Sequence, residues 1–350
     1  MKNGKLGFGI IGCGVIGPWH ARAIAANEKA ELVAACDIIP EKVKQFCAEY
    51  GENPAPYLDF HELIQDSRVD VVCICTPSGV HSEMAIAAAN AGKHILCEKP
   101  LDITLDKIDR MIEVAEKNRI KLAGIFQRRT YDSTQKVKQA MNEQLLGKMV
   151  LGDVYLKYYR SQAYYNSADW RGTWELDGGG ALMNQGIHGI DLLLWLMGDV
   201  DTVYGRCLTA VRQIKVEDTA LAMLRYKNGA LGVLEGTTSV NPGEETRIEL
   251  NGKLGTIIYK ESEITRWAVT TGDDERAKDI EIESGEQQAG AVADPRDIGV
   301  LGHIRHVADM IEAIETDREP MVTGESARKS VELILAIYQS SRTKKEVQLP

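Results

Sequence analysis

Residues 6–17 read LGFGIIGCGVIG, an apolar run that passes directly into the spacing Gly-x-Gly-x-x-Gly. In this spacing Gly12 permits a tight turn, Gly14 lets the backbone approach a pyrophosphate, and Gly17 allows a following helix to pack closely. The motif follows a predicted strand and opens a predicted helix, which is the context of a dinucleotide-binding βαβ unit. This stretch therefore predicts a Rossmann-type fold.

The residues around this loop also indicate which dinucleotide binds. The amides of Val15 and Ile16 open the predicted helix, where backbone N–H groups favour phosphate charge. Twenty residues after Gly17, Asp37 ends the second predicted strand. A carboxylate there can accept both ribose hydroxyls of NAD and would repel the 2′-phosphate of NADP. Ile38 follows it, not an arginine, so NAD is expected and NADP is the less favoured alternative.

Strands and helices alternate through residues 1–125. Short apolar runs rich in Ile, Val and Cys are expected as strands: Leu6–Ile11, Glu31–Cys36, Val69–Cys75, His94–Cys97 and Lys121–Ile125. Apolar residues three and four apart predict the helices between them: His20–Asn27, Pro40–Tyr50, Asp59–Gln65, His81–Ala91 and Leu105–Asn118. This alternation predicts an α/β domain, a doubly wound parallel sheet with helices on both faces.

The pattern changes after Phe126, and a second domain is expected over residues 126–350. Longer alternating runs predict a mainly antiparallel sheet: Val150–Arg160, Thr202–Leu208, Asp218–Tyr226, Gly229–Thr238, Thr246–Asn251 and Gly255–Tyr259. Turn residues predict hairpins at 227–229 and 241–243. Helices are expected at Tyr131–Leu145, Ala181–Leu196, 296–316 and 325–341, and a solvated loop or edge hairpin at 273–286.

Composition excludes several classes of protein. The 350 residues are 44% hydrophobic and 26% charged, as in ordinary globular domains. A net charge of −10 without a basic patch argues against nucleic-acid binding. No apolar run approaches the roughly 18 residues that span a bilayer, and none near the start suits a signal peptide. The odd count of seven cysteines suggests reduced, buried thiols, so we expect a cytoplasmic protein with no metal site.

Two further segments follow predicted strands at the edge where the cofactor would bind. Thr76 and Pro77 come directly after the third long strand and could line the ribose or diphosphate, with His81 at the start of the next helix. Glu98 and Lys99 end the following strand, near the expected nicotinamide. The Lys99 ammonium could hydrogen-bond an alcohol or carbonyl oxygen and stabilise negative charge on it.

These segments combine with a later stretch, residues 178–191, which reads GGGALMNQGIHGID. Together they resemble the glucose–fructose oxidoreductase/inositol dehydrogenase (Gfo/Idh/MocA) family over nearly the whole chain. The resemblance implies a Rossmann domain followed by an α+β domain whose open-faced, predominantly antiparallel sheet builds the substrate pocket and the oligomer interface. It also implies oxidation or reduction of secondary alcohols and ketones of sugars, cyclitols and their derivatives.

By the same resemblance Lys99 is the active-site lysine, also in contact with cofactor and substrate, and His188 is the acid/base. Imidazole titrates near neutrality and can take and return a hydroxyl proton. Asn184 lies four residues before His188, on the same helix face. Many family members carry Asp there. Asn cannot accept a proton, so we expect Asn184 to orient a substrate hydroxyl and His188 to work with Lys99 alone.

Aromatic and charged residues crowd the segment 160–174 before the glycine run. Tyr164, Trp170 and Arg171 are candidate substrate contacts, because rings stack on sugar faces and a guanidinium grips hydroxyls or a carboxylate. Packing of Tyr and Trp as loop anchors is the alternative.

The expected function is hydride transfer between NAD(H) and a sugar, cyclitol or sugar derivative, by a homodimer or homotetramer. Two alternatives remain open at this point. One is a redox-neutral, NAD-retaining enzyme that cleaves glycosides, and the other is a nucleotide-sensing binding protein without catalysis.

Overall fold

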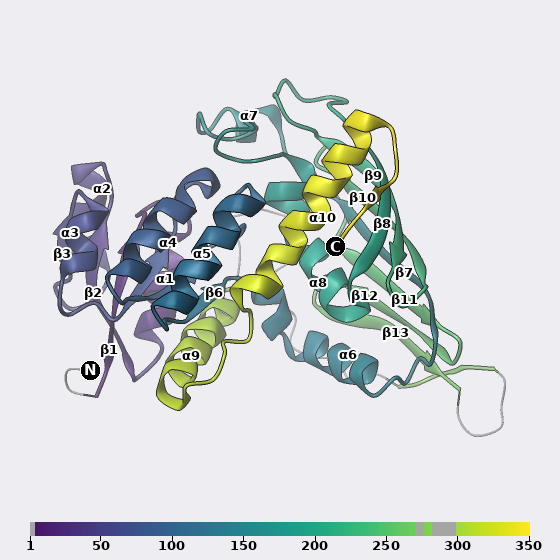
Figure 1. Ribbon diagram of the computed structural model, residues 1–350, viewed down its shortest axis with the longest axis horizontal. Coiled ribbons are helices and arrows are strands. Elements are labelled where there is room, and N and C mark those ends of the chain that lie inside the picture. Colours follow the sequence, from purple (N-terminus) through teal and green to yellow (C-terminus); the bar gives the residue numbers. More distant parts are fainter. Residues whose placement is uncertain (1–3, 271–275, 282–298) are drawn as a thin grey trace. The chain divides into compact units, whose positions relative to one another are not determined.

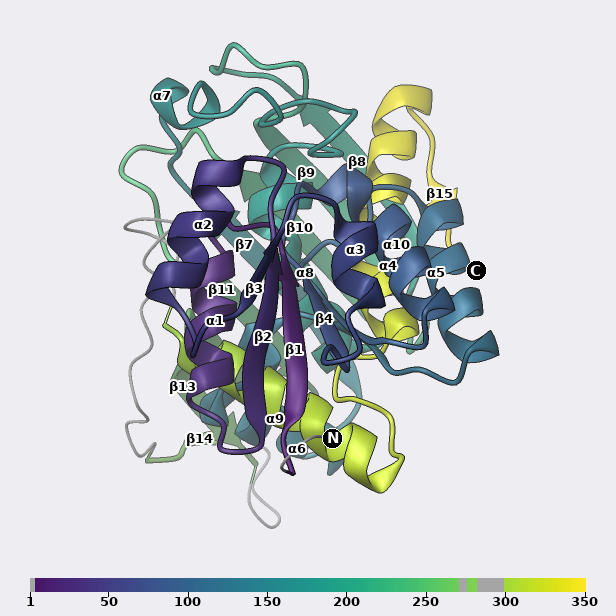
Figure 2. The ribbon, with the colours of Figure 1, turned by 90° about the vertical axis from the view of Figure 1, so that its left-hand side faces the viewer.

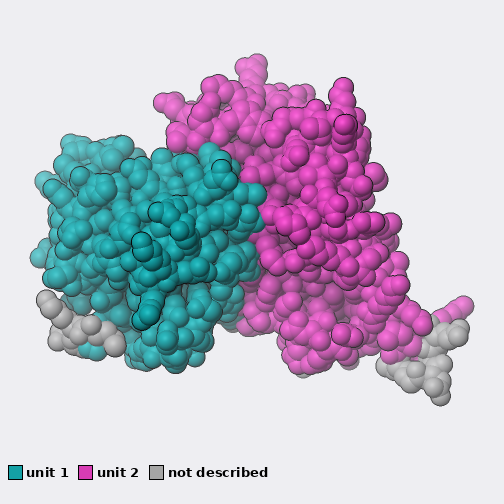
Figure 3. Space-filling view, in the orientation of Figure 1, with its two compact units in different colours: residues 1–127, 299–328 teal, residues 128–298, 329–350 magenta. Residues whose placement is uncertain are grey.

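The computed structural model describes residues 4–270, 276–281 and 299–350. The chain forms two compact units, coloured separately in Figure 3. The first unit takes residues 1–127 and 299–328, and the second takes residues 128–298 and 329–350. The chain therefore leaves the first unit, builds most of the second, returns, and then leaves again.

The first unit is built on a parallel sheet. Its strands are β1 (Leu6–Ile11), β2 (Ala30–Cys36), β3 (Ala55–Tyr57), β4 (Val71–Ile74), β5 (His94–Cys97) and β6 (Leu122–Gly124). Their order is β3-β2-β1-β4-β5-β6, and every neighbouring pair is parallel. The predicted doubly wound sheet is confirmed. β3 was not expected, because its three residues are too few to show a period.

Helices cover both faces of this sheet (Figure 2). α1 (Gly17–Ala25) and α2 (Pro40–Glu49) lie on one face; α3 (Phe60–Gln65), α4 (His81–Asn90) and α5 (Leu105–Lys117) lie on the other. α9 (Leu301–Thr316), from near the chain's end, packs against α1. Val307 and Met310 of α9 join Phe8 and Ile24 in one buried core. α9 thus completes the layer that α1 begins.

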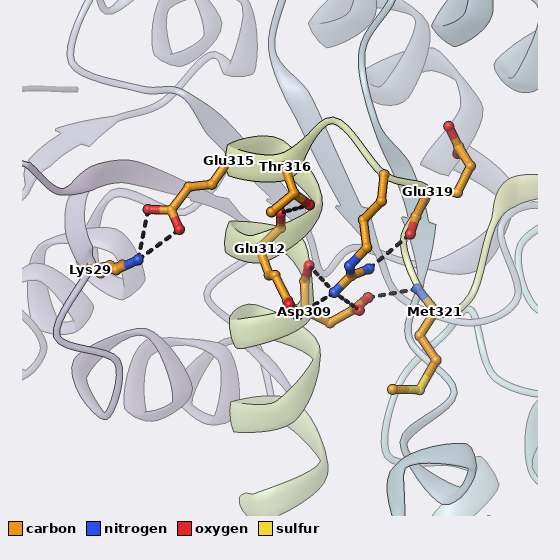
Figure 4. A network of polar contacts seen from close by, with 8 residues as sticks. Lys29, Asp309, Glu312, Glu315, Thr316, Glu319 and Met321 are labelled. Atoms are coloured by element: carbon orange, nitrogen blue, oxygen red, sulfur yellow. Dashed lines mark hydrogen bonds and ion pairs between the residues drawn. The ribbon is translucent and has the colours of Figure 1, made fainter.

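Polar contacts fix the far end of α9 (Figure 4). Lys29, just before β2, places its Nζ 2.7 Å from a Glu315 carboxylate oxygen. The Arg318 guanidinium lies 2.8 Å from Asp309, which also accepts a hydrogen bond of 2.7 Å from the Met321 amide. These pairs are partly exposed, so they orient the helix end and add little stability.

The second unit is built on a nine-stranded mixed sheet. Its strands are β7 (Met149–Lys157), β8 (Val200–Leu208), β9 (Thr219–Tyr226), β10 (Leu231–Thr237), β11 (Arg247–Gly252), β12 (Gly255–Lys260), β13 (Glu263–Val269), β14 (Lys278–Asp279) and β15 (Val347–Gln348). The order is β14-β13-β12-β11-β7-β10-β9-β8-β15. Among the strands of the described residues, only β7 and β10 pair in parallel, so the mainly antiparallel sheet is confirmed.

Of the two predicted hairpins, one is correct. Residues 227–229 join the paired strands β9 and β10. The hairpin expected at 241–243 is wrong, because β7 lies between β10 and β11 and pairs with both. Turn residues there mark a longer connection that crosses over β7. Of the acidic stretch 273–286, residues 273–275 and 282–286 lie outside the described residues, and β14 pairs at the sheet edge.

The described helices α6 (Asp132–Asn142), α8 (Ile187–Met197) and α10 (Gly324–Thr343) lie on one side of this sheet in Figure 1. A four-residue helix, α7 (Gln162–Tyr165), lies in the segment before the glycine run. The single helix expected at 181–196 is two elements, a π-helical turn at Ala181–Gly186 followed by α8. No helix within the described ranges has the length and apolar character needed to cross a membrane.

A buried ion pair ties α8 to the segment before α6. Arg129 Nε and Nη2 lie 2.7 and 2.5 Å from the two carboxylate oxygens of Asp191, and both side chains are at most 3% exposed. The bidentate geometry satisfies both charges where water cannot reach them. Removing one partner leaves the other charge buried without compensation.

We therefore expect Asp191→Asn to lower the free energy of unfolding by about 3 kcal/mol. Asp279→Asn is the matched control, because Asp279 pairs with Arg266 on the surface, where such pairs contribute about 0–1 kcal/mol. Urea unfolding of the two variants measures the difference. Equal losses in both would contradict the assignment of the buried pair as structural.

Candidate active site

The glycine loop after β1 has the space that a dinucleotide needs. Gly12 has φ of +103°, and a Cβ there would lie 2.6 Å from the Cys75 carbonyl oxygen. A Cβ on Gly17 would lie 2.6 Å from the Gly12 carbonyl oxygen. A Cβ on Gly14 would have no atom of the described residues within 4 Å. Protein packing thus explains Gly12 and Gly17, whereas Gly14 leaves an open space that suits a pyrophosphate.

Charge around this loop also suits NAD. The first turn of α1 has no acidic residue, and Val15, just before the helix, is 56% exposed. Asp37 follows β2, and its carboxylate accepts hydrogen bonds from the amides of Cys13 (3.0 Å) and Ile39 (2.9 Å). Burial and, secondarily, Asp37 raise the pKa of Cys13 to about 12, so that side chain stays a neutral thiol beside the phosphate position.

His81 braces the two turns that follow β4 and β5. Its buried ring places Nδ1 2.8 Å from the Pro100 carbonyl oxygen and Nε2 2.8 Å from the Thr76 carbonyl oxygen. A neutral imidazole can donate to only one of them at a time. Thr76 and Pro77 are half-buried at the end of β4. The ring therefore fixes the backbone on either side of the cofactor edge.

A second brace holds Lys99 through Glu98. The buried Glu98 Oε1 lies 2.9 Å from His20 Nε2 on α1 and 3.2 Å from His303 Nε2 on α9. Its Oε2 accepts a hydrogen bond of 3.3 Å from the Lys99 amide. Lys99 itself is half-buried. The lysine backbone is thus fixed by a carboxylate that two helices hold.

The shared Glu98 carboxylate and burial together shift the pKa values of the three groups in this cluster. Burial by itself raises the pKa of Glu98, but hydrogen bonds from both histidines outweigh it and hold that pKa well below its usual range. Burial opposes charge on His20, but Cys75 and Glu98 raise the pKa of His20 to about 10. Burial lowers the pKa of His303. Glu98 is therefore held as a carboxylate by the two imidazoles that contact it.

The ligand atoms of His20, Glu98 and His303 lie within 4.8 Å of one another, a spacing that a metal ion also requires. Both Nε2 atoms already contact the same Glu98 oxygen, which accounts for the cluster by hydrogen bonding alone. His20 was not singled out from the sequence. The sequence pattern that could have indicated it is the helix spacing: His20 follows Gly17 by three residues and lies on the same face of α1 as the buried Ala23 and Ile24.

In the second unit, the π-helical turn and the start of α8 expose one narrow face. Between residues 181 and 190 only Asn184, Gln185 and His188 are half-buried, and all others are buried. Asn184 Nδ2 lies 2.5 Å from Oδ1 of Asp177, and Gln185 Nε2 donates 3.0 Å to Asn184 Oδ1. The predicted pair Asn184 and His188 therefore shares the accessible face.

Glu217 holds the start of this turn. Its buried carboxylate accepts hydrogen bonds from the amides of Gly180 (3.0 Å) and Leu182 (2.9 Å) and from the Tyr338 hydroxyl (2.8 Å). Burial raises the pKa of Glu217 to about 7 despite these donors. A side chain on Gly180 would collide with the Glu217 backbone. Gly180 is therefore needed for close packing against Glu217.

The aromatic segment contributes a stacked arginine. The Arg171 guanidinium lies 4.3 Å from the Tyr164 ring centre and 4.6 Å from the Trp170 ring centre. Arg171 also donates to the Tyr164 hydroxyl, which accepts a second hydrogen bond of 2.8 Å from Gln185. The structure therefore brings Tyr164, Trp170, Arg171 and Asn184 together within the second unit.

This fold and these groups define a dinucleotide-binding oxidoreductase: a doubly wound sheet with a phosphate loop, and a second unit bearing a histidine on an accessible helix face. Residues 6–125 match the family described as "Oxidoreductase family, NAD-binding Rossmann fold", and residues 134–258 match "GFO/IDH/MocA C-terminal domain". The chain belongs to the GFO/IDH/MocA family. It is an NAD-dependent oxidoreductase acting on CH–OH groups.

Several relatives are similar along most of the chain. Myo-inositol 2-dehydrogenase of Thermotoga maritima is 30% identical over 347 residues, 98% of each chain. Levoglucosan dehydrogenase of Pseudarthrobacter phenanthrenivorans is 30% identical over 74% of each. Among solved structures, the WlbA dehydrogenase of Bordetella pertussis, in complex with NADH and UDP-GlcNAcA, has a TM-score of 0.85 and 32% identity over 99% of each chain.

We expect Gly14→Ala to abolish measurable NADH binding, because its Cβ enters the open space that suits the pyrophosphate. The melting temperature should change little, because that Cβ meets no atom of the described residues within 4 Å. Gly12→Ala is the comparison: its Cβ meets Cys75 at a positive φ, so we expect a lower melting temperature as well. NADH fluorescence titration and thermal unfolding measure the two effects. Unchanged NADH affinity in folded Gly14→Ala would show that the loop does not bind the pyrophosphate.

Proposed function

We propose that this protein transfers a hydride between NAD(H) and a carbinol carbon of a sugar, cyclitol or sugar derivative, with Lys99 and His188 as its catalytic residues. The observation that carries the proposal is the accessible helix face of the second unit. Asn184 and His188 are half-buried there, in a stretch whose other residues, Gln185 apart, are buried. The names of the inositol and levoglucosan dehydrogenases support the substrate class.

In this proposal each side chain has one task. A bound NAD would supply the hydride acceptor for the carbinol carbon. Lys99 donates a hydrogen bond to the substrate oxygen and stabilises the negative charge that develops on it. His188 takes the hydroxyl proton, for which an imidazole is suited near neutral pH. Glu98 keeps the Lys99 backbone in place through its contacts with His20 and His303.

The cofactor contacts follow from the glycine loop and the two braced turns. We place the pyrophosphate over Gly12–Gly17, including the amides of Val15 and Ile16, and the adenosine ribose on Asp37. Thr76 and Pro77 line the cofactor, and Glu98 and Lys99 meet its nicotinamide end. His81 supports the cofactor site indirectly, by holding the backbone of the two turns, because both its ring nitrogens face backbone carbonyls.

For the substrate, the stacked arginine favours an acidic group. Arg171 Nε and Arg212 Nε are buried and have no hydrogen-bond partner among the described residues. Such donors suit a carboxylate or phosphate. The WlbA dehydrogenase structure, a complex with NADH and UDP-GlcNAcA, is consistent with this class of substrate. We propose that Tyr164 and Trp170 stack on the sugar while Arg171 binds the acidic group and Asn184 a hydroxyl.

The first experiment follows NADH absorbance with NAD or NADP across myo-inositol, levoglucosan, uronic acids, UDP-sugar acids and glycosides. We expect NADH production with NAD, and the lowest KM for an acid-bearing compound. Sugar release without net NADH would instead indicate the redox-neutral cleavage of glycosides. No NADH production and no sugar release with any compound of the panel would count against the proposed substrate class.

With the compound that reacts, we expect Lys99→Ala and His188→Ala each to lower kcat by about 10²–10⁴-fold, because each removes a group that acts on the reacting oxygen or its proton. NADH affinity should stay within about threefold of the wild type if neither loss is due to unfolding. Lys44→Ala and His61→Ala are exposed controls of the same chemistry. Activity within twofold of the wild type in both site variants would contradict the assignment.

We also propose that the protein is a homodimer or homotetramer whose contact is the outer face of the second sheet. Leu221, Met223, Leu231 and Val233 point from β9 and β10 to this face and are 36–61% exposed, with Met223 opposite Val233. Such contiguous apolar surface marks an interaction site.

A cytoplasmic location is proposed as well, since four of the cysteines are buried free thiols.

We expect Met223→Glu to shift the protein to a smaller species in size-exclusion chromatography with light scattering, because a charge at the centre of the apolar face must be desolvated on association. Leu58→Glu is the control, since Leu58 is 52% exposed in the other unit. A monomeric wild type, or an unchanged Met223→Glu oligomer, would contradict this interface.

A further inference from the structure

Asp177 is a buried carboxylate that the sequence analysis did not single out. It ends a turn in which the amides of Asp177 and Gly178 donate to the Thr173 carbonyl, at 3.2 and 3.1 Å. Asp177 is only 2% exposed. Its Oδ2 accepts a hydrogen bond of 2.8 Å from the Gly172 amide. The other oxygen, Oδ1, faces Asn184 Nδ2 at 2.5 Å. A buried carboxylate is costly unless such donors are present.

This contact fixes the orientation of the Asn184 amide. Only the NH₂ side of an Asn can donate to a carboxylate, so Oδ1 must turn the other way. There it accepts 3.0 Å from Gln185 Nε2. Gln185 Oε1 in turn accepts 3.1 Å from Arg160 Nε, and Gln185 Nε2 donates 2.8 Å to the Tyr164 hydroxyl. Donors and acceptors alternate consistently along the network, so each bond strengthens its neighbours.

The same amide lies on the helix face that carries His188. Asn184 and His188 are four residues apart, which places them on one side of the helix. Asp177 lies outside the helix, and its carboxylate contacts the Asn184 amide directly. Asp177 therefore acts on this face through the amide that it contacts.

Three tyrosine hydroxyls are ionisable neighbours of Asp177. These are Tyr164, Tyr165 and Tyr338; Arg171 donates to the Tyr164 hydroxyl, and the Tyr338 hydroxyl donates to Glu217. The Asn184 amide donates a hydrogen bond to its carboxylate. Exchange of that amide for a carboxyl would therefore set two acids at hydrogen-bond distance.

We propose that Asp177 is a positioning residue of the catalytic site that acts through Asn184, so that the two form a matched pair of one carboxylate and one amide. The inference rests on the proposed function. Asp177 orients the amide that binds a substrate hydroxyl, on the helix face that also carries His188. The pair should tolerate exchange of its members better than the loss of either one.

The test compares Asp177→Asn, Asn184→Asp and the exchanged double variant with the wild type. Melting temperatures at pH 5.5 and 8 need no substrate. Two facing carboxyls cannot both ionise, so we expect Asn184→Asp to melt near the wild type at pH 5.5 and at least about 4 °C lower at pH 8. The double variant should lose this dependence on pH. Glu175→Gln, an exposed carboxyl in the same turn, is the control.

Turnover of the compound that the wild type oxidises gives the second readout. We expect Asp177→Asn to lower kcat at least about 30-fold with an unchanged KM for NAD, and the double variant to recover to within about fivefold of the wild type. Asn184→Asp should shift the acidic limb of the rate profile, because its two carboxyls share a proton.

Two results would overturn the inference alone. One is an Asn184→Asp melting temperature that falls no further between pH 5.5 and 8 than that of the wild type. The other is an active wild type in which Asp177→Asn keeps full kcat, or in which the exchange recovers nothing over the single variants. If Asp177→Asn does not fold, the double variant still decides the question. A wild type that oxidises nothing in the panel overturns the proposed function, and the role of Asp177 with it.

Discussion

A carboxylate taken out of water must find hydrogen-bond donors, and both candidate catalytic segments depend on this requirement. In the first unit Glu98 finds them on α1, on α9 and in the Lys99 amide, so the lysine stands on a backbone that cannot shift without losing them. In the second unit Glu217 finds them in Gly180, Leu182 and Tyr338. Each acid fixes its segment, because a movement of the backbone that broke these hydrogen bonds would leave a buried carboxylate without donors. That loss costs more free energy than a local change of the backbone can regain.

Much of the fold could be predicted from local pattern. β1 and β5 begin and end where their apolar runs do, and the hairpin at 227–229 follows from its Asn-Gly pair. Tertiary pairing decided the rest. Residues 241–243 have hairpin chemistry but no adjacent partner strand, because β7 fills the place between β10 and β11. Nor does the spacing of α9 indicate that it packs on α1, since any buried helix face has that period.

The candidate site divides in the same way. The glycine loop, Asp37 and the stretch that contains His188 stand out because their chemistry is local and their spacing is short. Asp177 and Glu217 carry no such signal, since an acid in a loop is ordinary until the chain folds over it. Asn184 shows the limit most clearly: its sequence position says that a carboxylate is missing, and only the contact with Asp177 shows where one is.

The interrupted first unit has a consequence for how the chain is made. Its sheet and α1 are translated early, but His303 and the apolar side of α9 leave the ribosome only after most of the second unit has been synthesised. Until then a nascent chain exposes the apolar surface of α1 and holds Glu98 with one histidine instead of two. The core of the first unit therefore cannot be completed until residues 301–316 have been synthesised.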